Sequence, residues 1–276
     1  MIEQLVYSTY RLEAYTADGR VSSGTGFCML FENKATGDQS HVIVTNKHVI
    51  DGCEQLVMHT HMHNGDGNPI KNKKITVTIS LQDGGVIRHP NPRIDLACFS
   101  LVHAGMKTED DLMPFYVPLE TALIPTEDQL AELSHMENVV MIGYPNGIWD
   151  EHNNLPIIRR GVTATHPGLR FNDESIFITD IATFPGSSGS PVLIVDQGSY
   201  VKRDGTTMLG YSRAHLLGVT YATYQRELTG EVKKIPIPTA DRIISQTNVP
   251  IHLGLCVHSK EILELERELW KRAYVT

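Results

Sequence analysis

The glycine- and serine-rich segment GSSGSP, residues 186–191, constrains the fold of this chain more than any other stretch. Pro185 fixes the backbone angle φ just before the segment, and the apolar, β-branched run VLIV follows it. Glycines on both sides let the backbone bend so that the Ser188 hydroxyl stands clear, and they let the amides of Gly186 and Ser188 point at one spot. These features predict a nucleophilic serine beside an oxyanion hole. A plain turn between two strands is the alternative interpretation.

A serine hydroxyl becomes a useful nucleophile only when a base takes its proton and a third group orients that base. The run VIVTNKHV supplies His48 near its end, and the run RIDLACFSL supplies Asp95 near its start. An acid at the start of a buried strand is shielded from water, so its hydrogen bond can hold the imidazole in one tautomer. As alternatives, His48 caps a strand and Asp95 is an ordinary turn residue. The order His48, Asp95, Ser188 is that of chymotrypsin-like proteases, whereas α/β-hydrolases place the serine first.

Seven segments, taken in order, resemble the trypsin-like peptidase family and most closely its HtrA-like bacterial branch. They are VTNKHVI, RIDLACF, VVMIGYPNG, IIRRGVTA, ITDIATFPGSSGSPVL, HLLGVTYAT and IPIPTADRII. The resemblance extends from Gly24 to Ile244. It departs from the family at Ser190, where a second glycine is usual, and we expect no PDZ domain to follow.

This resemblance implies a serine endopeptidase that acts on peptide bonds in protein or peptide substrates. His48 would be the general base, Asp95 would orient it, and Ser188 would attack the peptide carbonyl to form an acyl-enzyme. The amides of Gly186 and Ser188 would hold the oxyanion. A protease fold retained as a peptide-binding or scaffold module is the alternative, but such a module has no physical need for all three reacting residues.

The resemblance also places the pocket that receives the substrate side chain before the cut bond. Its floor would be Ala182, and its walls would be Thr183 and the strand residues Thr220, Tyr221 and Ala222. None of these residues is charged, so a lysine or arginine would lose its water shell and find no carboxylate partner. We therefore expect cleavage after small or medium apolar residues.

Short alternating strands separated by turns, with almost no helical periodicity, predict an all-β fold. We expect two antiparallel six-stranded β-barrels of the chymotrypsin and trypsin type, with a C-terminal α-helix. Residues 1–110 would form the first barrel, with His48 and Asp95, and 111–135 an acidic, proline-containing linker. Residues 136–246 would form the second barrel, with Ser188, which the run Ile235 to Pro238 closes.

The remaining residues, 247–276, would form a tail with one amphipathic helix that packs on the barrels. In this helix, from Ser259 to Ala273, apolar residues recur on one face, and Ser259 is placed to cap its start. We expect the helix to dock on the second barrel. Binding of a partner or a second copy by this helix is the alternative.

The stretch from Leu56 to Lys74 is polar and turn-rich, and His59, His61 and His63 occupy alternate positions in it. Three imidazoles on one strand face could bind zinc, but a cluster on a surface loop is the commoner arrangement. We therefore expect neither a metal site nor a cofactor.

The chain has 276 residues, of which 41% are hydrophobic, enough for a substantial core. Its formal charge of −8 argues against a phosphate-binding surface, so nucleic acid is not an expected partner. No apolar window approaches the length that crosses a membrane, so no membrane is expected either. The N-terminal segment lacks the features of a signal peptide, which predicts a cytoplasmic protein. The sequence leaves open whether a protein partner activates the enzyme.

Four cysteines, Cys28, Cys53, Cys98 and Cys256, are too few and too scattered for a disulfide framework. Three of them lie in or beside apolar runs, so we expect free thiols. None lies in the GSSGSP segment, which argues against a cysteine nucleophile.

Overall fold

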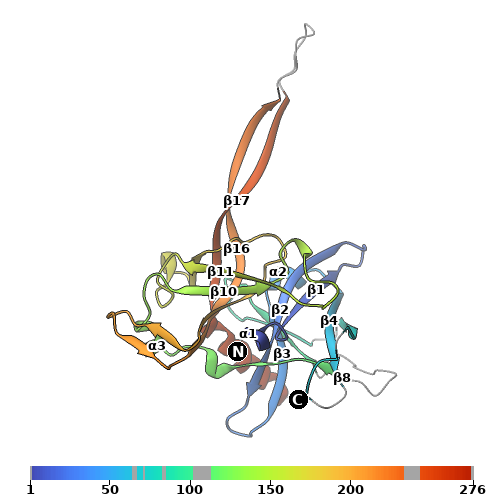
Figure 1. Cartoon of the computed structure of the whole chain (residues 1–276). Coiled ribbons are helices and arrows are strands. Elements are labelled where there is room, and N and C mark those ends of the chain that lie inside the picture. Colours follow the sequence, from blue (N-terminus) through green and yellow to red (C-terminus); the bar gives the residue numbers. More distant parts are fainter. Residues whose placement is uncertain are drawn as a thin grey trace.

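The computed structural model describes residues 2–63, 67–70, 72–82, 85–101, 113–232 and 243–274. Two β-sheets dominate these residues, and a long two-stranded ribbon projects from the body (Figure 1). No helix in these ranges is long and apolar enough to cross a membrane. The all-β fold class predicted from the sequence is confirmed.

The N-terminal half contains nine strands and two short helices. The strands are β1 (Thr9–Tyr15), β2 (Val21–Glu32), β3 (Gln39–Thr45), β4 (Gln55–His63), β5 (Lys74–Ser80), β6 (Val86–Arg88), β7 (Ala97–Ser100), β8 (Met113–Phe115) and β9 (Leu119–Glu120). The helices are α1 (Ile2–Leu5) and α2 (Lys47–Ile50). The sheet has the order β5-β4-β1-β2-β3-β7-β6, while β8 pairs with β4, and β9 runs parallel to β2.

Strand β2 lies at the centre of the molecule because its two faces enter two different cores. Phe27 and Met29 belong to a hydrophobic cluster that the second half of the chain and the C-terminal helix also enter. Cys28, between them, belongs to a cluster made only by residues of the N-terminal half. Successive side chains of a strand point to opposite faces, so a strand buried on both faces needs the continuous apolar run that FCMLF provides.

The C-terminal half is a closed barrel of six antiparallel strands in the order β10-β11-β12-β17-β16-β13. These are β10 (Asn138–Gly143), β11 (Ile157–Thr163), β12 (Ile176–Asp180), β13 (Pro191–Asp196), β16 (Arg213–Val232) and β17 (Ile243–His258). A small hairpin, β14 (Ser199–Val201) with β15 (Thr207–Leu209), leaves the barrel after β13. The short helix α3 (Glu127–Ala131) precedes β10, and 3₁₀ turns lie at Thr121–Leu123, Pro145–Gly147, Phe171–Asp173 and Ser259–Glu261.

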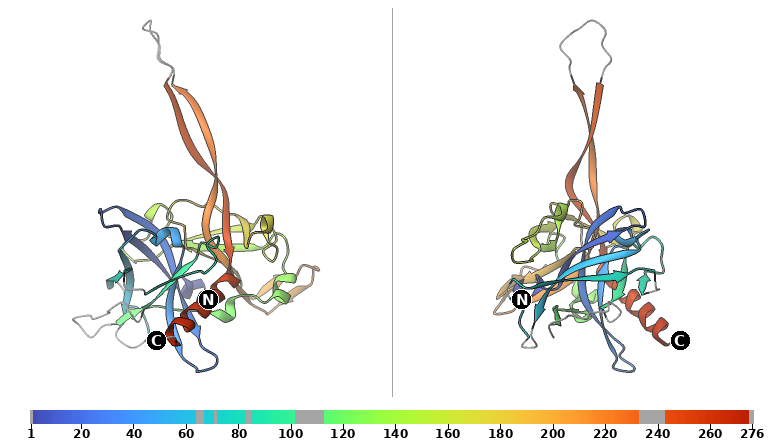
Figure 2. Two further views of the ribbon diagram at one scale, coloured as in Figure 1. Left: turned by 180° about the vertical axis from the view of Figure 1, so that it is seen from behind. Right: turned by 90° about the vertical axis from the view of Figure 1, so that its right-hand side faces the viewer.

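Strands β16 and β17 continue past the barrel as the projecting ribbon, which we define as Gln225–Val232 paired with Ile243–Pro250. The pairing register shifts between Thr220 and Ala222 and again between Thr223 and Gln225. Such bulges bend and twist a strand. Figure 2 shows the two strands twisting about each other where they leave the body.

The C-terminal helix α4 (Ile262–Tyr274) joins the two halves rather than docking on the second barrel alone. Ile262 and Leu265 are fully buried in the cluster that contains residues of both sheets. The Glu266 carboxylate accepts a hydrogen bond from the Glu32 amide at 2.9 Å. Arg272 donates to the carbonyl oxygen of Val86 at 3.0 Å, so the end of the helix is tied to the N-terminal sheet.

Several details differ from the sequence-based expectations. Among the described residues, the N-terminal sheet has nine strands where six were expected, and two of the nine, Met113–Phe115 and Leu119–Glu120, were expected in the linker. The stretch expected to be turn-rich after Leu56 is strand β4 as far as His63. Ser259 does not cap a helix but begins a buried 3₁₀ turn. The predicted boundary at residue 246 lies within β17, and the run from 235 to 238, expected to close the barrel, lies outside the described residues.

We expect Leu265→Ala to lower the free energy of unfolding by about 2–5 kcal/mol, because it leaves a cavity in the shared core. Arg267→Ala on the exposed side of the same helix is the matched control and should change it by less than about 0.5 kcal/mol. Urea unfolding at two protein concentrations measures both. If the Leu265→Ala effect appeared only at high concentration, the helix would bind a second copy instead.

Candidate active site

His48 and Asp95 are in direct contact. The Nδ1 atom of His48 lies 2.5 Å from Asp95 Oδ2, and the His48 amide donates to Asp95 Oδ1 at 3.2 Å. About half of the His48 side chain is exposed, against 22% for Asp95. With Nδ1 donating to the carboxylate, the imidazole keeps Nε2 free as an acceptor, which is the tautomer that a general base needs.

Two local structures hold this pair. His48 lies in helix α2, which follows β3. Asn46, the residue before this helix, donates its side-chain amide to the Asp95 carbonyl at 2.7 Å. Asp95 follows the turn that contains Asn91, whose carbonyl accepts hydrogen bonds from Lys47 at 3.0 Å and from the Ile94 amide at 3.1 Å. Both segments therefore lie at the same end of the N-terminal sheet, where β3 ends and β7 begins.

Ser188 lies in the loop between β12 and β13, and burial distinguishes it from its neighbours. Ser187 and Ser190 are completely buried, whereas Ser188 is partly exposed. The Ser187 hydroxyl accepts from the Phe184 amide at 3.4 Å. The Ser190 hydroxyl is buried without a hydrogen-bond partner among the described residues. Ser188 is thus the serine of this segment that solvent or a substrate can reach.

The nucleophile loop is hydrogen-bonded to the N-terminal sheet through Thr25 of β2. The Thr25 amide donates to the Ser188 carbonyl at 2.8 Å, and its hydroxyl donates to the Gly186 carbonyl at 2.8 Å. The carbonyl of Thr25 accepts from the hydroxyl of Thr45, the last residue of β3, at 2.7 Å. Because α2 follows β3, these bonds bring the Ser188 loop to the end of the sheet at which His48 lies.

Two glycines of the loop have backbone angles that favour glycine, with φ of +87° at Gly186 and +88° at Gly189. A Cβ atom on Gly186 would lie 2.5 Å from the carbonyl oxygen of Tyr144. On Gly189 it would lie 1.9 Å from the carbonyl oxygen of Thr25. Both contacts are with backbone, which cannot swing away, so the loop requires glycine for conformation and for space.

The amides of Gly186 and Ser188 donate no hydrogen bond to any residue that the structure describes. Unpaired amides are uncommon in a buried loop. Two of them on either side of one residue are what an oxyanion hole requires. The Ser188 hydroxyl itself lies 3.5 Å from the Tyr221 carbonyl oxygen, to which it donates, and no hydrogen bond joins it to His48. Such catalytic contacts often form only when substrate binds.

Comparison with known proteins identifies the family. Residues 24–201, more than half of the chain, match the trypsin-like peptidase domain. The chain belongs to the trypsin-like peptidase family. It is therefore, at the level of the family, a serine-protease hydrolase.

One solved structure supports the fold, and two others are less similar. The HtrA-type protease AlgW, bound to a tripeptide, matches with a TM-score of 0.51 and 14% identity over 99% of this chain and 63% of its own. The active form of the Rv3671c protease of M. tuberculosis matches with a TM-score of 0.47 and 16% identity over 95% of this chain and 80% of its own. Deg5 matches with a TM-score of 0.47 and 18% identity over 80% of this chain and 82% of its own. No curated protein sequence matches significantly.

Ala182, predicted as the floor of the specificity pocket, contacts a cation that was not predicted from the sequence. Arg159 of β11 donates to the Ala182 carbonyl at 2.6 Å, and its guanidinium lies 4.8 Å from the centre of the Phe184 ring. Thr183 and Thr220 are buried, and burial raises the pKa of Tyr221 to about 12. Arg159 was not predictable because no motif connects β11 with the loop after β12.

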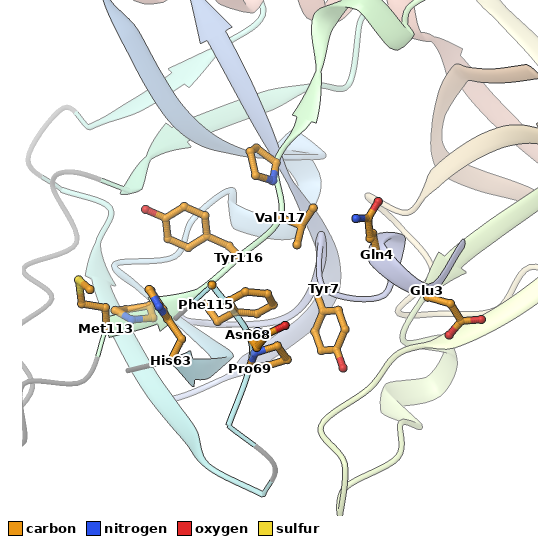
Figure 3. Close-up of a pocket in the computed structure, with 13 residues that line it drawn as sticks. Glu3, Gln4, Tyr7, His63, Asn68, Pro69, Met113, Phe115, Tyr116 and Val117 are labelled. Atoms are coloured by element: carbon orange, nitrogen blue, oxygen red, sulfur yellow. The ribbon is translucent and has the colours of Figure 1, made fainter. Parts of the chain in front are cut away.

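A separate cavity of about 720 Å³ lies beside α1, β4 and β8 (Figure 3). Aromatic rings line part of it, with Tyr7 and Phe115 edge to face at 5.4 Å between ring centres. None of the predicted site residues borders this cavity. It is therefore not the substrate pocket that the sequence predicts.

The histidines on alternate positions of β4 have protein partners. His59 lies 3.1 Å from Thr76 Oγ1, and His61 lies 2.8 Å from the Asn153 carbonyl oxygen. His63 stacks edge to face on Phe115. Among the residues described, no group of three or more His, Cys, Asp or Glu side chains could hold a metal ion.

All four cysteines are free thiols. Cys28, Cys98 and Cys256 are buried, and burial raises the pKa of Cys98 to about 12 and that of Cys256 to about 11. A thiol with such a pKa is protonated at neutral pH and is a poor nucleophile.

We expect Gly189→Ala to lower the free energy of unfolding by about 2–5 kcal/mol, because it adds a backbone clash to an unfavourable φ. Gly205→Ala is the matched control: its φ is +87°, but no atom lies within 4 Å of the added methyl group. That control should cost about 1–2 kcal/mol. Equal effects of the two substitutions in urea unfolding would contradict the close packing of Gly189 on Thr25.

Proposed function

We propose that this protein is a serine endopeptidase that uses His48, Asp95 and Ser188 as a catalytic triad. The observation that carries the proposal is the loop around Ser188: one accessible serine lies in it, and its own amide and that of Gly186 have no partner in the described protein. The contact between His48 and Asp95 at 2.5 Å supports the assignment of the base. The Thr25 hydrogen bonds supply a physical reason for the two halves of the site to meet.

The proposed reaction has two steps. Ser188 Oγ attacks the peptide carbonyl carbon while its proton passes to His48 Nε2, and the amides of Gly186 and Ser188 hold the oxyanion. His48 then returns the proton to the amine as the C–N bond breaks, which leaves an acyl ester on Ser188. Water attacks the ester with the same proton transfers and releases the acid. Asp95 stabilises the imidazolium that forms in each step.

We further propose that cleavage follows small or medium apolar residues such as Val, Ala, Leu or Thr. The contact of Arg159 with the Ala182 carbonyl supports weak cleavage after lysine or arginine, since it places a positive charge beside the residue assigned to the pocket floor. A like charge nearby adds to the cost of removing a basic side chain from water.

A reducing compartment, the cytoplasm, fits this enzyme best, because all four thiols are free. We also propose that any protein that activates the enzyme would act on the loop from Thr183 to Ser187. This loop contains the Gly186 amide, and ordering it would shift the population toward a formed oxyanion hole.

A fluorophosphonate probe should label Ser188 alone, because it needs an activated and accessible hydroxyl. Ser188→Ala should abolish labelling and lower turnover by about 10⁶-fold, as in other serine proteases. Tandem mass spectrometry of the labelled protein identifies the site.

Iodoacetamide at neutral pH is the control and should leave turnover unchanged, because three thiols are buried and protonated and the fourth, Cys53, is not a residue of the proposed site. Labelling of Ser187 or Ser190 would contradict the assignment. A well-folded protein that binds peptides but neither reacts nor cleaves would favour the scaffold alternative.

Profiling against a peptide library should show small or medium apolar residues before the cut bond. The measured quantity is kcat/KM for peptides that differ only at that position. Arg159→Gln should improve cleavage after lysine relative to alanine, because it removes the positive charge beside Ala182. A dominant lysine, arginine or aspartate in the wild-type profile would show that a residue other than Ala182 forms the floor.

A further inference from the structure

Strand β16 passes the nucleophile and then leaves the barrel. The Tyr221 carbonyl, near its middle, accepts the hydrogen bond of the Ser188 hydroxyl. From there β16 continues without interruption to Val232, into the projecting ribbon (Figure 1). At about 3.3 Å per residue, the part beyond Ser188 extends on the order of 35 Å.

One edge of this part of β16 is unpaired. On the barrel side, β13 pairs with β16 only as far as Val219, and the next residue, Thr220, is bonded to Gly189 and Ser190. Beyond Thr220 no strand among the described residues pairs with that edge. The other edge of β16 is occupied by β17 throughout the ribbon. The free edge therefore begins at the proposed catalytic serine.

The corresponding free edge of β17 does not meet the catalytic site in this way. Strand β12 pairs with β17 up to Leu253, and the Ile181 amide donates to the His252 carbonyl at 3.1 Å. The edge of β17 becomes free beyond His252, on the side of the barrel wall, whereas the edge of β16 becomes free at Tyr221 and Ser188. Only a peptide on β16 would run continuously into the cut site.

We propose that the free edge of β16 from Tyr221 to Val232 binds the substrate segment upstream of the cut bond as an added antiparallel strand. This inference rests on the proposed function and extends it. The resemblance places only Thr220, Tyr221 and Ala222 of this strand, in the wall of the pocket, whereas here the same edge continues along the whole ribbon. The substrate class is a protein with a long extended or unfolded stretch before the cleavage site.

The direction of the bound peptide follows from the direction of β16. The residue before the cut bond lies at Tyr221, and β16 runs from there toward the ribbon tip. Residues farther upstream therefore pair with positions farther along β16, so the peptide runs antiparallel to it. In such a pair, every second peptide residue exchanges hydrogen bonds with the strand and the intervening residues point away. Recognition is mainly through the backbone and tolerates many sequences.

A third strand would also stabilise the ribbon. Two strands alone are marginally stable in water, and three or more are usually needed for independent stability. An unpaired strand edge is a template for pairing with another chain. A substrate strand added on β16 would satisfy the free N–H and C=O groups of that edge and stabilise the ribbon together with the complex.

Peptide length provides the test. We would compare kcat/KM for a peptide with about four residues before the cut bond and one with about ten, at about 3.3 Å of strand per residue. The matched control carries the same extra residues after the cut bond. The upstream extension should raise kcat/KM about 10-fold, because the added hydrogen bonds are partly offset by ordering of the peptide. The downstream extension should raise it less than about 2-fold, since it adds no such bonds.

Backbone methylation distinguishes strand pairing from nonspecific attraction. A single N-methyl group moved along the upstream segment should reduce the gain at every second position and leave it intact at the positions between. Shortening the ribbon, by joining Gln225 to Pro250 through an Asn-Gly turn, should remove the upstream gain and preserve cleavage of the short peptide. A gain that survives this deletion, or lacks the two-residue period, overturns the proposal.

Two further measurements separate the possible failures. If the protein cut no peptide, the proposed function would fail, but Ser188→Ala protein could still report on the ribbon by fluorescence anisotropy. About 10-fold tighter binding of the upstream-extended peptide would support the site, and equal binding of both peptides would overturn it. Sedimentation of the full and shortened proteins tests for a second copy of this chain. Loss of self-association on shortening, with an unchanged length dependence, would make that copy the occupant and overturn the proposal.

Discussion

The three hydrogen bonds around Thr25 are the interactions on which the arrangement of the site depends. They connect β2, β3 and the loop that carries Ser188, and the most distant partners, Thr25 and Ser188, are 163 residues apart. The Cβ of any residue other than glycine at position 189 would occupy the place of the Thr25 carbonyl. Because Gly189 has no side chain, the backbone of the loop can approach the backbone of β2 at this point. The glycines and Thr25 therefore act together: they hold the loop that carries Ser188 against β2 and β3, and His48 follows β3.

The shared hydrophobic core also connects the two halves of the chain. Phe27 and Met29 of β2 pack in one hydrophobic cluster with barrel residues and with Leu265 of the C-terminal helix. Since β2 also carries Thr25, a shift of one half relative to the other would disturb both the core and the hydrogen bonds to the loop. A cleft between two sheets needs such a rigid connection, because small displacements of reacting groups cost large factors in rate.

Much of this architecture was predictable from particular patterns. Strand alternation and the order of three motifs indicated the all-β fold and brought His48, Asp95 and Ser188 forward as candidates, and the structure places His48 on Asp95. Their catalytic roles stay predictions. Thr25 and Arg159 were missed because they act through backbone carbonyls of distant loops, which leave no pattern in side-chain types. The flanking glycines of Gly24-Thr25-Gly26 were the only available signal for Thr25.

The ribbon was missed for a different reason. A strand that leaves a barrel has the same local alternation as one that stays in it, and the length of a hairpin depends on where the chain turns rather than on its propensity. The strand residues named from the sequence therefore reach only to Ala222, although β16 continues to Val232. Two bulges, at Tyr221 and near Tyr224, turn the strand at the point where it passes Ser188. Bulges are common next to active sites because they re-aim a strand without ending it. The bulges thus turn β16 away from the barrel close to the point where its pairing with β13 ends.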